Sequence, residues 1–231
     1  MQWGTILLSM KKLLLTSCLA LGMATGLFAV PHVLDVQPFN GGAAVGSIKL
    51  HLDFVAAVNQ AVDAQVTISG TGDAAVVVGS SENLFAAPFI SGGNGVGFGN
   101  LNGEDTTLYL STGVGSITFD FASPQNYFGL LWGSVDDYNK LEFYDGDDLV
   151  ATILGTDVWA IANGDQGAAG TFYVNIFDTT GWFDQVVASS SQYAFEIDNI
   201  AYNSFSVPDS GATVALLGLS LACLVFFRRK A

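Results

Sequence analysis

The run Ser116-Ile-Thr-Phe-Asp-Phe121 decides the fold class of this chain of 231 residues. Every second residue in the run is apolar, which is the period of a β-strand with one buried face. Thr171-Phe-Tyr-Val-Asn-Ile-Phe177 repeats the pattern further along the chain. Asp145-Gly146 lies between two more apolar runs and is a strong signal for a hairpin turn. The sequence therefore predicts strands joined by tight turns.

Runs of this kind recur between clusters of turn-forming residues, and no stretch keeps a sustained helical period. We predict one all-β domain over residues 30–206, a single β-sandwich of jelly-roll-like architecture. The glycine-rich stretch 91–103 should be a loop. The expected strands are Gly46–Phe54, Ala64–Ser69, Ala74–Val78, Thr106–Leu110, Ser116–Phe121, Tyr127–Trp132, Lys140–Tyr144, Leu149–Leu154, Thr171–Phe177, Phe183–Ala188 and Tyr193–Tyr202.

The C-terminal end has a different pattern, in which a short motif precedes an apolar segment and a basic cluster. The apolar run Ala212–Phe227 has 16 residues and spans roughly 24 Å as a helix. That is somewhat short for a hydrocarbon core of about 30 Å, and long basic side chains can bridge part of the gap. We predict a transmembrane helix over 212–227 with the basic cluster on the cytoplasmic side. The flanking residues are Val207, Pro208, Asp209, Ser210 and Gly211 before the helix, and Arg228, Arg229 and Lys230 after it.

On these physical grounds alone, a plain C-terminal anchor explains the segment equally well. The order of motif, helix and basic tail over residues 207–231 resembles a PEP-CTERM-type sorting signal in its VPDSG variant. Such signals are read by exosortase, a membrane transpeptidase-like enzyme of bacteria that make exopolysaccharide. The resemblance implies transient anchoring in the inner membrane, removal of the tail, and delivery to the cell surface or extracellular matrix.

A second resemblance covers the body of the chain. The stretches Ser80–Phe89, Asn126–Asn139, Leu141–Gly146 and Phe195–Ile200 are similar to the body domain of a group of exosortase-dependent surface proteins. That group is defined by export and sorting, and it implies no enzymatic activity. The similarity therefore predicts a location more than a mechanism.

The N-terminal end is typical of a secretory signal peptide. Lys11 and Lys12 precede an apolar stretch with small residues near Ala29, so we predict a signal peptide over residues 1–29. Met10 is an alternative start, because the residues before it carry no charge. A lipoprotein signal ending at Cys18 is the second alternative, although the apolar stretch between Lys12 and Cys18 is too short for it.

Composition limits what the body can do. Both cysteines, Cys18 and Cys223, lie in the apolar terminal segments, so the body has no thiol chemistry and no disulfide. From Asp35 to Asp209 only Lys49 and Lys140 balance the 21 acidic residues, which gives this part of the chain a net charge of −19. Such a surface repels nucleic acid and attracts divalent cations, although solubility alone also accounts for it.

Three acidic groupings are candidate metal sites, since calcium takes six to eight oxygen ligands. Ordinary solvated turns, and a β-bulge in the last strand, are the competing explanations. The last strand also resembles that of galactose-binding-like carbohydrate-binding jelly rolls, whose aspartate often helps to hold a structural calcium. The candidate ligands are Asp136, Asp137 and Asn139 in the first grouping, Asp145, Asp147 and Asp148 in the second, and Asp198 and Asn199 in the third.

Aromatic residues suggest a carbohydrate site, for which Trp159 and Trp182 are the candidates because their surroundings are loop-like. Catalytic motifs are absent: the sequence has no nucleophile elbow, no His-Glu-x-x-His and no phosphate-binding loop. Glu142 and Glu196 are the carboxyl pair to consider for glycoside hydrolysis. We therefore expect a non-catalytic surface or matrix protein with a structural or adhesive role. The alternatives are a calcium-assisted module that binds exopolysaccharide and, last, a glycan-acting hydrolase.

Overall fold

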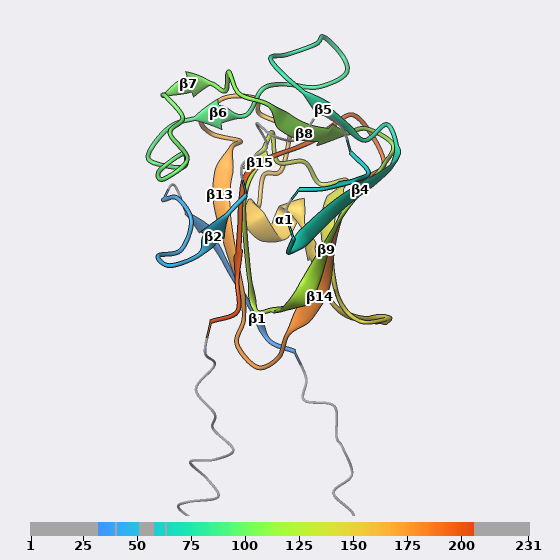
Figure 1. The fold of residues 1–231 in the computed structure, drawn as a ribbon. Helices are drawn as coiled ribbons and strands as arrows, with labels where there is room; N and C mark the ends of the chain where they lie inside the picture. Colours follow the sequence, from blue (N-terminus) through green and yellow to red (C-terminus); the bar gives the residue numbers. More distant parts are fainter. Residues whose placement is uncertain (1–31, 40, 51–57, 63, 206–231) are drawn as a thin grey trace, which may run out of the picture. The chain divides into compact units, whose positions relative to one another are not determined.

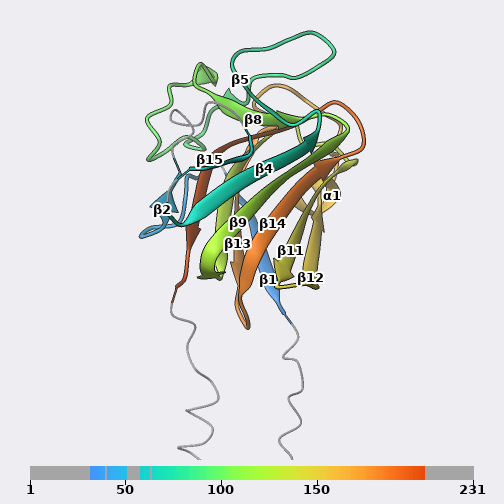
Figure 2. The same cartoon turned by 45° about the vertical axis from the view of Figure 1, so that its right-hand side comes forward.

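A computed structural model describes residues 32–39, 41–50, 58–62 and 64–205. The described chain forms two antiparallel β-sheets that pack face to face (Figures 1 and 2). The prediction of an all-β sandwich is therefore confirmed. The predicted signal peptide, the sorting motif and the transmembrane helix lie outside the described residues. Within those residues, no helix is long and apolar enough to cross a membrane.

The first sheet holds seven strands in the order β1-β13-β10-β15-β8-β5, with β2 also paired to β15. Four of these strands, β13, β10, β15 and β8, have antiparallel partners on both sides, and β15 lies near the middle of the order. The strands are β1 (Leu34–Phe39), β2 (Ile48–Lys49), β5 (Ala75–Val77), β8 (Tyr109–Thr112), β10 (Tyr127–Gly133), β13 (Phe172–Asp178) and β15 (Phe195–Asn203).

The second sheet holds six strands in the order β12-β11-β14-β9-β4-β3. A separate pair, β6 (Phe89–Ile90) with β7 (Gly103–Glu104), and a short helix, α1 (Gly155–Val158), complete the described elements. From β8 onward the chain moves repeatedly between the two sheets. The six strands are β3 (Gln60–Ala61), β4 (Val66–Gly72), β9 (Gly115–Gln125), β11 (Asn139–Asp145), β12 (Asp148–Leu154) and β14 (Phe183–Ser190).

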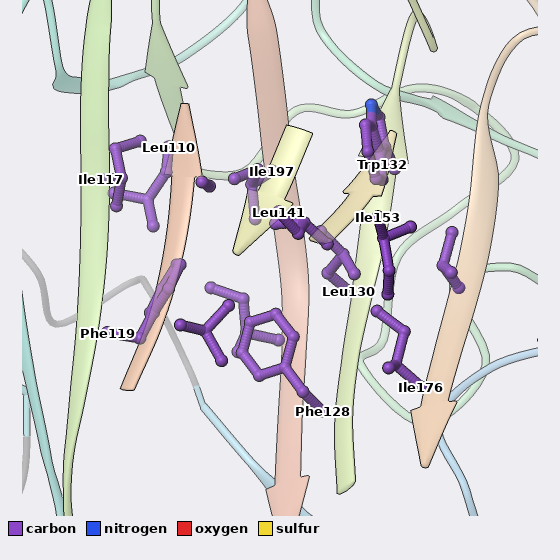
Figure 3. Packing of buried hydrophobic residues seen from close by; sticks show 14 of the residues in the cluster. Leu110, Ile117, Phe119, Phe128, Leu130, Trp132, Leu141, Ile153, Ile176 and Ile197 are labelled. Atoms are coloured by element: carbon purple, nitrogen blue, oxygen red, sulfur yellow. The ribbon is translucent and has the colours of Figure 1, made fainter. Parts of the chain in front are cut away.

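The core lies between the sheets, where side chains from both inner faces interleave (Figure 3). Ile117 and Phe119 of β9 are fully buried, as the alternation over 116–121 predicts. Phe119 meets Phe128 of the opposite sheet with ring centroids 5.4 Å apart, and the Trp132 ring stacks on Phe195 at 4.4 Å. Burial of these large rings is the main favourable term in the stability of the sandwich.

Strand β13 departs from simple alternation, because both of its faces are largely covered. Val174 and Ile176 point into the core as predicted, whereas Tyr173 belongs to a second cluster with Ile90 and Leu131. The glycine-rich loop 91–103 folds over this outer face, and Phe98 packs against Tyr173 at 6.1 Å between centroids. The alternating sequence of β13 therefore predicts one buried face, whereas both faces of the strand are largely buried in the structure.

Most predicted strands are present, with ends that differ by up to four residues. Of the predicted strand Gly46–Phe54, the structure shows β2, and residues 51–54 lie outside the described residues. The hairpin at Asp145-Gly146 is confirmed, since Asp145 pairs with Asp148 and Gly146 has a φ of 59°. The prediction missed β1, whose sequence combines Pro38 with charged and polar residues. Proline is tolerated there because β1 is at the edge of its sheet.

The strand registers define two ends of the sandwich. Asn203 at the end of β15 pairs with Tyr127, and Leu34 at the start of β1 pairs with Asp178. The described chain therefore enters and leaves at the same end, at the bottom of Figures 1 and 2. Glu196, at the start of β15, lies at the opposite end, roughly 23 Å away at about 3.3 Å per residue.

Candidate functional site

The opposite end of the sandwich holds a polar cleft with a volume of about 540 Å³. Four segments that are far apart in the sequence line it: 80–86 between β5 and β6, 134–138 between β10 and β11, 163–166 after α1, and 193–196 leading into β15. Hydroxyl, amide and carboxylate groups make up most of its wall. Such convergence of polar groups in a hollow is the usual form of a ligand site.

Glu196 forms the floor of the cleft, and it is only 2% exposed. Its Oε1 accepts a hydrogen bond of 2.9 Å from the Ala86 amide, and its Oε2 accepts one of 2.5 Å from the Ser134 hydroxyl. Burial raises the pKa of Glu196 to about 7, although these hydrogen bonds act in the opposite direction. One carboxylate thus ties the 80–86 segment and the residue that follows β10 to the start of β15.

Asp136 is the second carboxylate of the cleft and is 8% exposed. The Tyr138 hydroxyl lies 2.6 Å from its Oδ2 and 2.9 Å from the Tyr193 carbonyl oxygen. Burial raises the pKa of Asp136, the hydrogen bond from Tyr138 lowers it, and the charge of Asp137 raises it. The same neighbourhood raises the pKa of Tyr138, chiefly through burial, so this phenol stays protonated and can donate.

Local backbone geometry brings Asp136 into place. Gly164 has a φ of +70°, and a Cβ there would lie 2.7 Å from the Asp136 Oδ1. A Cβ on Gly155 would lie 1.9 Å from the Asp136 carbonyl oxygen. Ser134 adopts a φ of 37°, which is rare for a residue with a side chain. Backbone strain of this kind concentrates at functional sites, and here it accompanies the cleft.

A smaller hollow of about 220 Å³ adjoins the cleft and shares Leu84, Phe85 and Tyr193 with it. Tyr193 is 45% exposed and lies at the junction of the two hollows. The smaller hollow is lined mainly by apolar side chains, whereas the cleft is polar. The exposed Tyr193 ring therefore lies where a polar and an apolar surface meet.

The structure separates the candidate metal ligands. Asp145, Asp147 and Asp148 are exposed in the hairpin between β11 and β12, at the end of the sandwich away from the cleft. Of the first grouping, Asp136 lines the cleft, Asp137 is exposed, and Asn139 is buried with its side-chain amide 3.1 Å from the Ala194 carbonyl oxygen.

Asp198 and Asn199 are buried in β15, where a register irregularity opposite β10 and a φ of 50° at Asn199 fit the expected bulge. Among the described residues, no group of three or more histidine, cysteine, aspartate or glutamate side chains is arranged to hold a metal ion. Calcium therefore has no assembled set of carboxylates in the described part of the chain.

Trp159 and Trp182 are 39% and 38% exposed. They lie at opposite ends of β13, because the Trp159 ring packs on Phe172 at 5.2 Å while Trp182 follows Asp178 at the other end. They cannot form one platform for a sugar.

Glu142 and Glu196 are also apart. Glu142 is on β11 of the second sheet, where it pairs with Lys140 at 2.8 Å, whereas Glu196 is in the first sheet. The buried carboxylate that shares the cleft with Glu196 is Asp136, which the sequence suggested only as a metal ligand.

Several cleft residues escaped the sequence analysis because nothing local marks them. Asn163 and Gln166 are ordinary loop residues in the sequence, and Tyr193 begins the predicted last strand. Ser134 and the 80–86 segment are distinguished only by their resemblance to sorted proteins. The one signal that could have pointed to these residues is that loops joining strands at the same end of a sandwich often carry binding residues.

The fold and the site define an all-β sandwich with a polar cleft at the end away from the two ends of the described chain. A family model for the VPDSG-CTERM motif matches residues 206–231. The chain thus carries a PEP-CTERM-type, exosortase-dependent sorting signal, as predicted. It is therefore an exported protein that an exosortase-type enzyme sorts. The signal also indicates association with the surface.

No curated protein sequence matches the chain significantly. Among solved structures, the enzymatically active domain of tailspike protein 4 from bacteriophage CBA120 matches with 15% identity and a TM-score of 0.24. The match covers 62% of this chain and 20% of the tailspike chain. A likeness this weak carries no argument about function.

Proposed function

We propose that this protein is a non-catalytic, glycan-binding protein of the cell surface or extracellular matrix, with an adhesive role. The single observation that carries the proposal is the polar cleft, in which Asp136, Tyr138, Asn163, Gln166 and Tyr193 converge. Hydroxyl-rich ligands are recognised through hydrogen bonds to such groups and through contact with an aromatic ring. We further propose that the host's own exopolysaccharide is the ligand and that the sandwich is a jelly roll. The strand orders β8-β15-β10-β13 and β9-β14-β11-β12 support the latter.

The position of the cleft supports an adhesive role. The described chain ends at Phe205, at the end of the sandwich away from the cleft. If the sorting segment attaches the protein from that end, the cleft faces away from the point of attachment. An extended polymer outside the cell would then reach the cleft without passing the attached end of the sandwich.

A glycan hydrolase is the second candidate, and the observation that favours it is the presence of two buried carboxylates in one cleft. A general acid must reach the glycosidic oxygen within hydrogen-bonding distance. Both oxygens of Glu196 already accept hydrogen bonds, from Ala86 and Ser134. This engagement supports binding without hydrolysis.

The test is a glycan-binding measurement on the purified full-length protein, with the host polysaccharide among the probes. Asn163→Ala removes an exposed amide from the cleft wall, and we expect weaker binding. Asn102→Ala removes an exposed amide outside the cleft and should leave binding unchanged. Failure of the folded protein to bind any glycan would reject the proposal, and release of shortened glycan products would replace it with the hydrolase.

A further inference from the structure

The wall of the cleft carries charge of one sign only. Glu82, Asp136 and Glu196 line it, and none of its other lining residues is lysine, arginine or histidine. Asp136 and Glu196 are both more than nine-tenths buried, so water screens their charges poorly. A buried carboxylate normally has a cationic or hydrogen-bonding partner.

The described chain has few cations to supply that partner. It contains two lysines and no arginine. Lys140 pairs with Glu142 at 2.8 Å, and the Lys49 ammonium lies 5.6 Å from the centre of the Phe98 ring. His32 contacts Asp178 at the far end of the sandwich. Within the described residues, therefore, no protein cation neutralises the cleft carboxylates.

Asp136 also has hydrogen-bonding capacity left over. Its Oδ2 accepts from Tyr138, whereas no described protein group donates to its Oδ1. The Gly164 backbone lies against this carboxylate, and Asp136 is among the residues that line the cleft. A ligand group that donates a charge-assisted hydrogen bond there would offset the cost of burying the carboxylate.

We infer that the cleft selects a glycan that bears a protonated amine, that is, an amino sugar without its N-acetyl group. The inference rests on the proposed glycan-binding function and adds the chemistry of the preferred sugar. The ammonium donates to Asp136 Oδ1, while hydroxyls of the same chain meet Asn163, Gln166 and Tyr193. Uronic acids are disfavoured, because a carboxylate ligand would lie in the same hollow as the carboxylates of Glu82 and Asp136.

Two ligands that differ only in this charge test the inference. Titration calorimetry on the full-length protein would compare a glucosamine tetramer with its fully N-acetylated counterpart, at about pH 6, where sugar amines are protonated. We expect the amine form to bind at least about tenfold more tightly, the ratio that one charge-assisted hydrogen bond supplies. Asp136→Asn keeps the shape of the side chain and should remove this preference, so that the two tetramers bind with similar affinity.

The neighbouring substitution Asp137→Asn is the matched control. Asp137 is exposed and does not line the cleft, so the preference should persist. Equal affinity for the two tetramers in the wild type would overturn the inference while leaving glycan binding intact. Binding of a lysine tetrapeptide as tightly as the amino sugar would also overturn it, since charge alone would then suffice. Absence of binding to every glycan would instead reject the proposed function itself.

Discussion

The buried carboxylate of Glu196 makes a specific prediction about stability and pH. Replacing it with glutamine keeps the shape of the side chain, and the amide can accept from the Ala86 N–H and donate to the Ser134 hydroxyl. The substitution removes the ionisation but retains both hydrogen bonds. Glu196→Gln is therefore expected to stabilise the protein at alkaline pH.

The magnitude follows from the pKa of the buried group. Burial raises the pKa of Glu196 from 4.5 to about 7, so the folded state holds the proton more tightly than the unfolded state. Between these two values the stability of the wild type falls as pH rises, and it stays low above about 7. At 1.36 kcal/mol for each pKa unit, the loss is about 3 kcal/mol. Glu196→Gln cannot ionise at this position, so its free energy of unfolding does not include this loss.

The assay is urea unfolding followed by tryptophan fluorescence at pH values from 4 to 8, for the wild type and for Glu196→Gln. The two free energies of unfolding should agree near pH 4 and differ by about 3 kcal/mol at pH 8, with the variant more stable. Ser134→Ala removes a hydrogen bond that lowers the pKa, so it should extend the pH dependence of the wild type to higher pH. Parallel profiles for the wild type and Glu196→Gln, or a variant that is less stable at pH 8, would refute the reasoning.

Four further predictions concern other parts of the chain. Gly164→Ala should lower the free energy of unfolding by more than about 2 kcal/mol, because φ is positive and the new Cβ meets the Asp136 carboxylate. Gly146→Ala also has a positive φ but open space around the new Cβ, so its loss should be about 1–2 kcal/mol. Thermal unfolding of both variants measures the difference. Phe119→Ala should cost about 3–5 kcal/mol in urea unfolding by leaving a cavity, and the exposed Val114→Ala should cost less than about 0.5 kcal/mol. Mass spectrometry of the protein from its host should show the chain cut near 207–211, and an intact C-terminus would contradict processing. If calcium supports the fold, a chelator should lower the melting temperature and added calcium restore it; an unchanged melting temperature would reject a structural calcium.

Local pattern was sufficient for the fold class. The alternation over 116–121 and the Asp145-Gly146 turn are properties of short segments, and both are present as predicted. The prediction was weaker where burial came from a distant segment. Tyr173 looked like the polar side of β13, and it is buried because the 91–103 loop covers it. A strand's own sequence does not reveal what packs on its outer face.

The sorting signal could also be read without a fold, since the order of motif, apolar run and basic cluster is itself what a processing enzyme reads. The cleft could not. The Ser134 hydroxyl and the Glu196 carboxylate that it contacts are 62 positions apart, and Ala86 is 110 positions from Glu196. Nothing in either segment predicts the other.

An exported, acidic β-sandwich with a sorting signal could be inferred from the sequence, because strand periodicity, charge and terminal motifs are local or additive properties. The three-dimensional arrangement was needed to learn which carboxylates share a cleft, that Trp159 and Trp182 lie apart, and that the cleft is at the end away from the two ends of the described chain. Burial and proximity depend on strand order and register, and so does the raised pKa of Glu196 that follows from them.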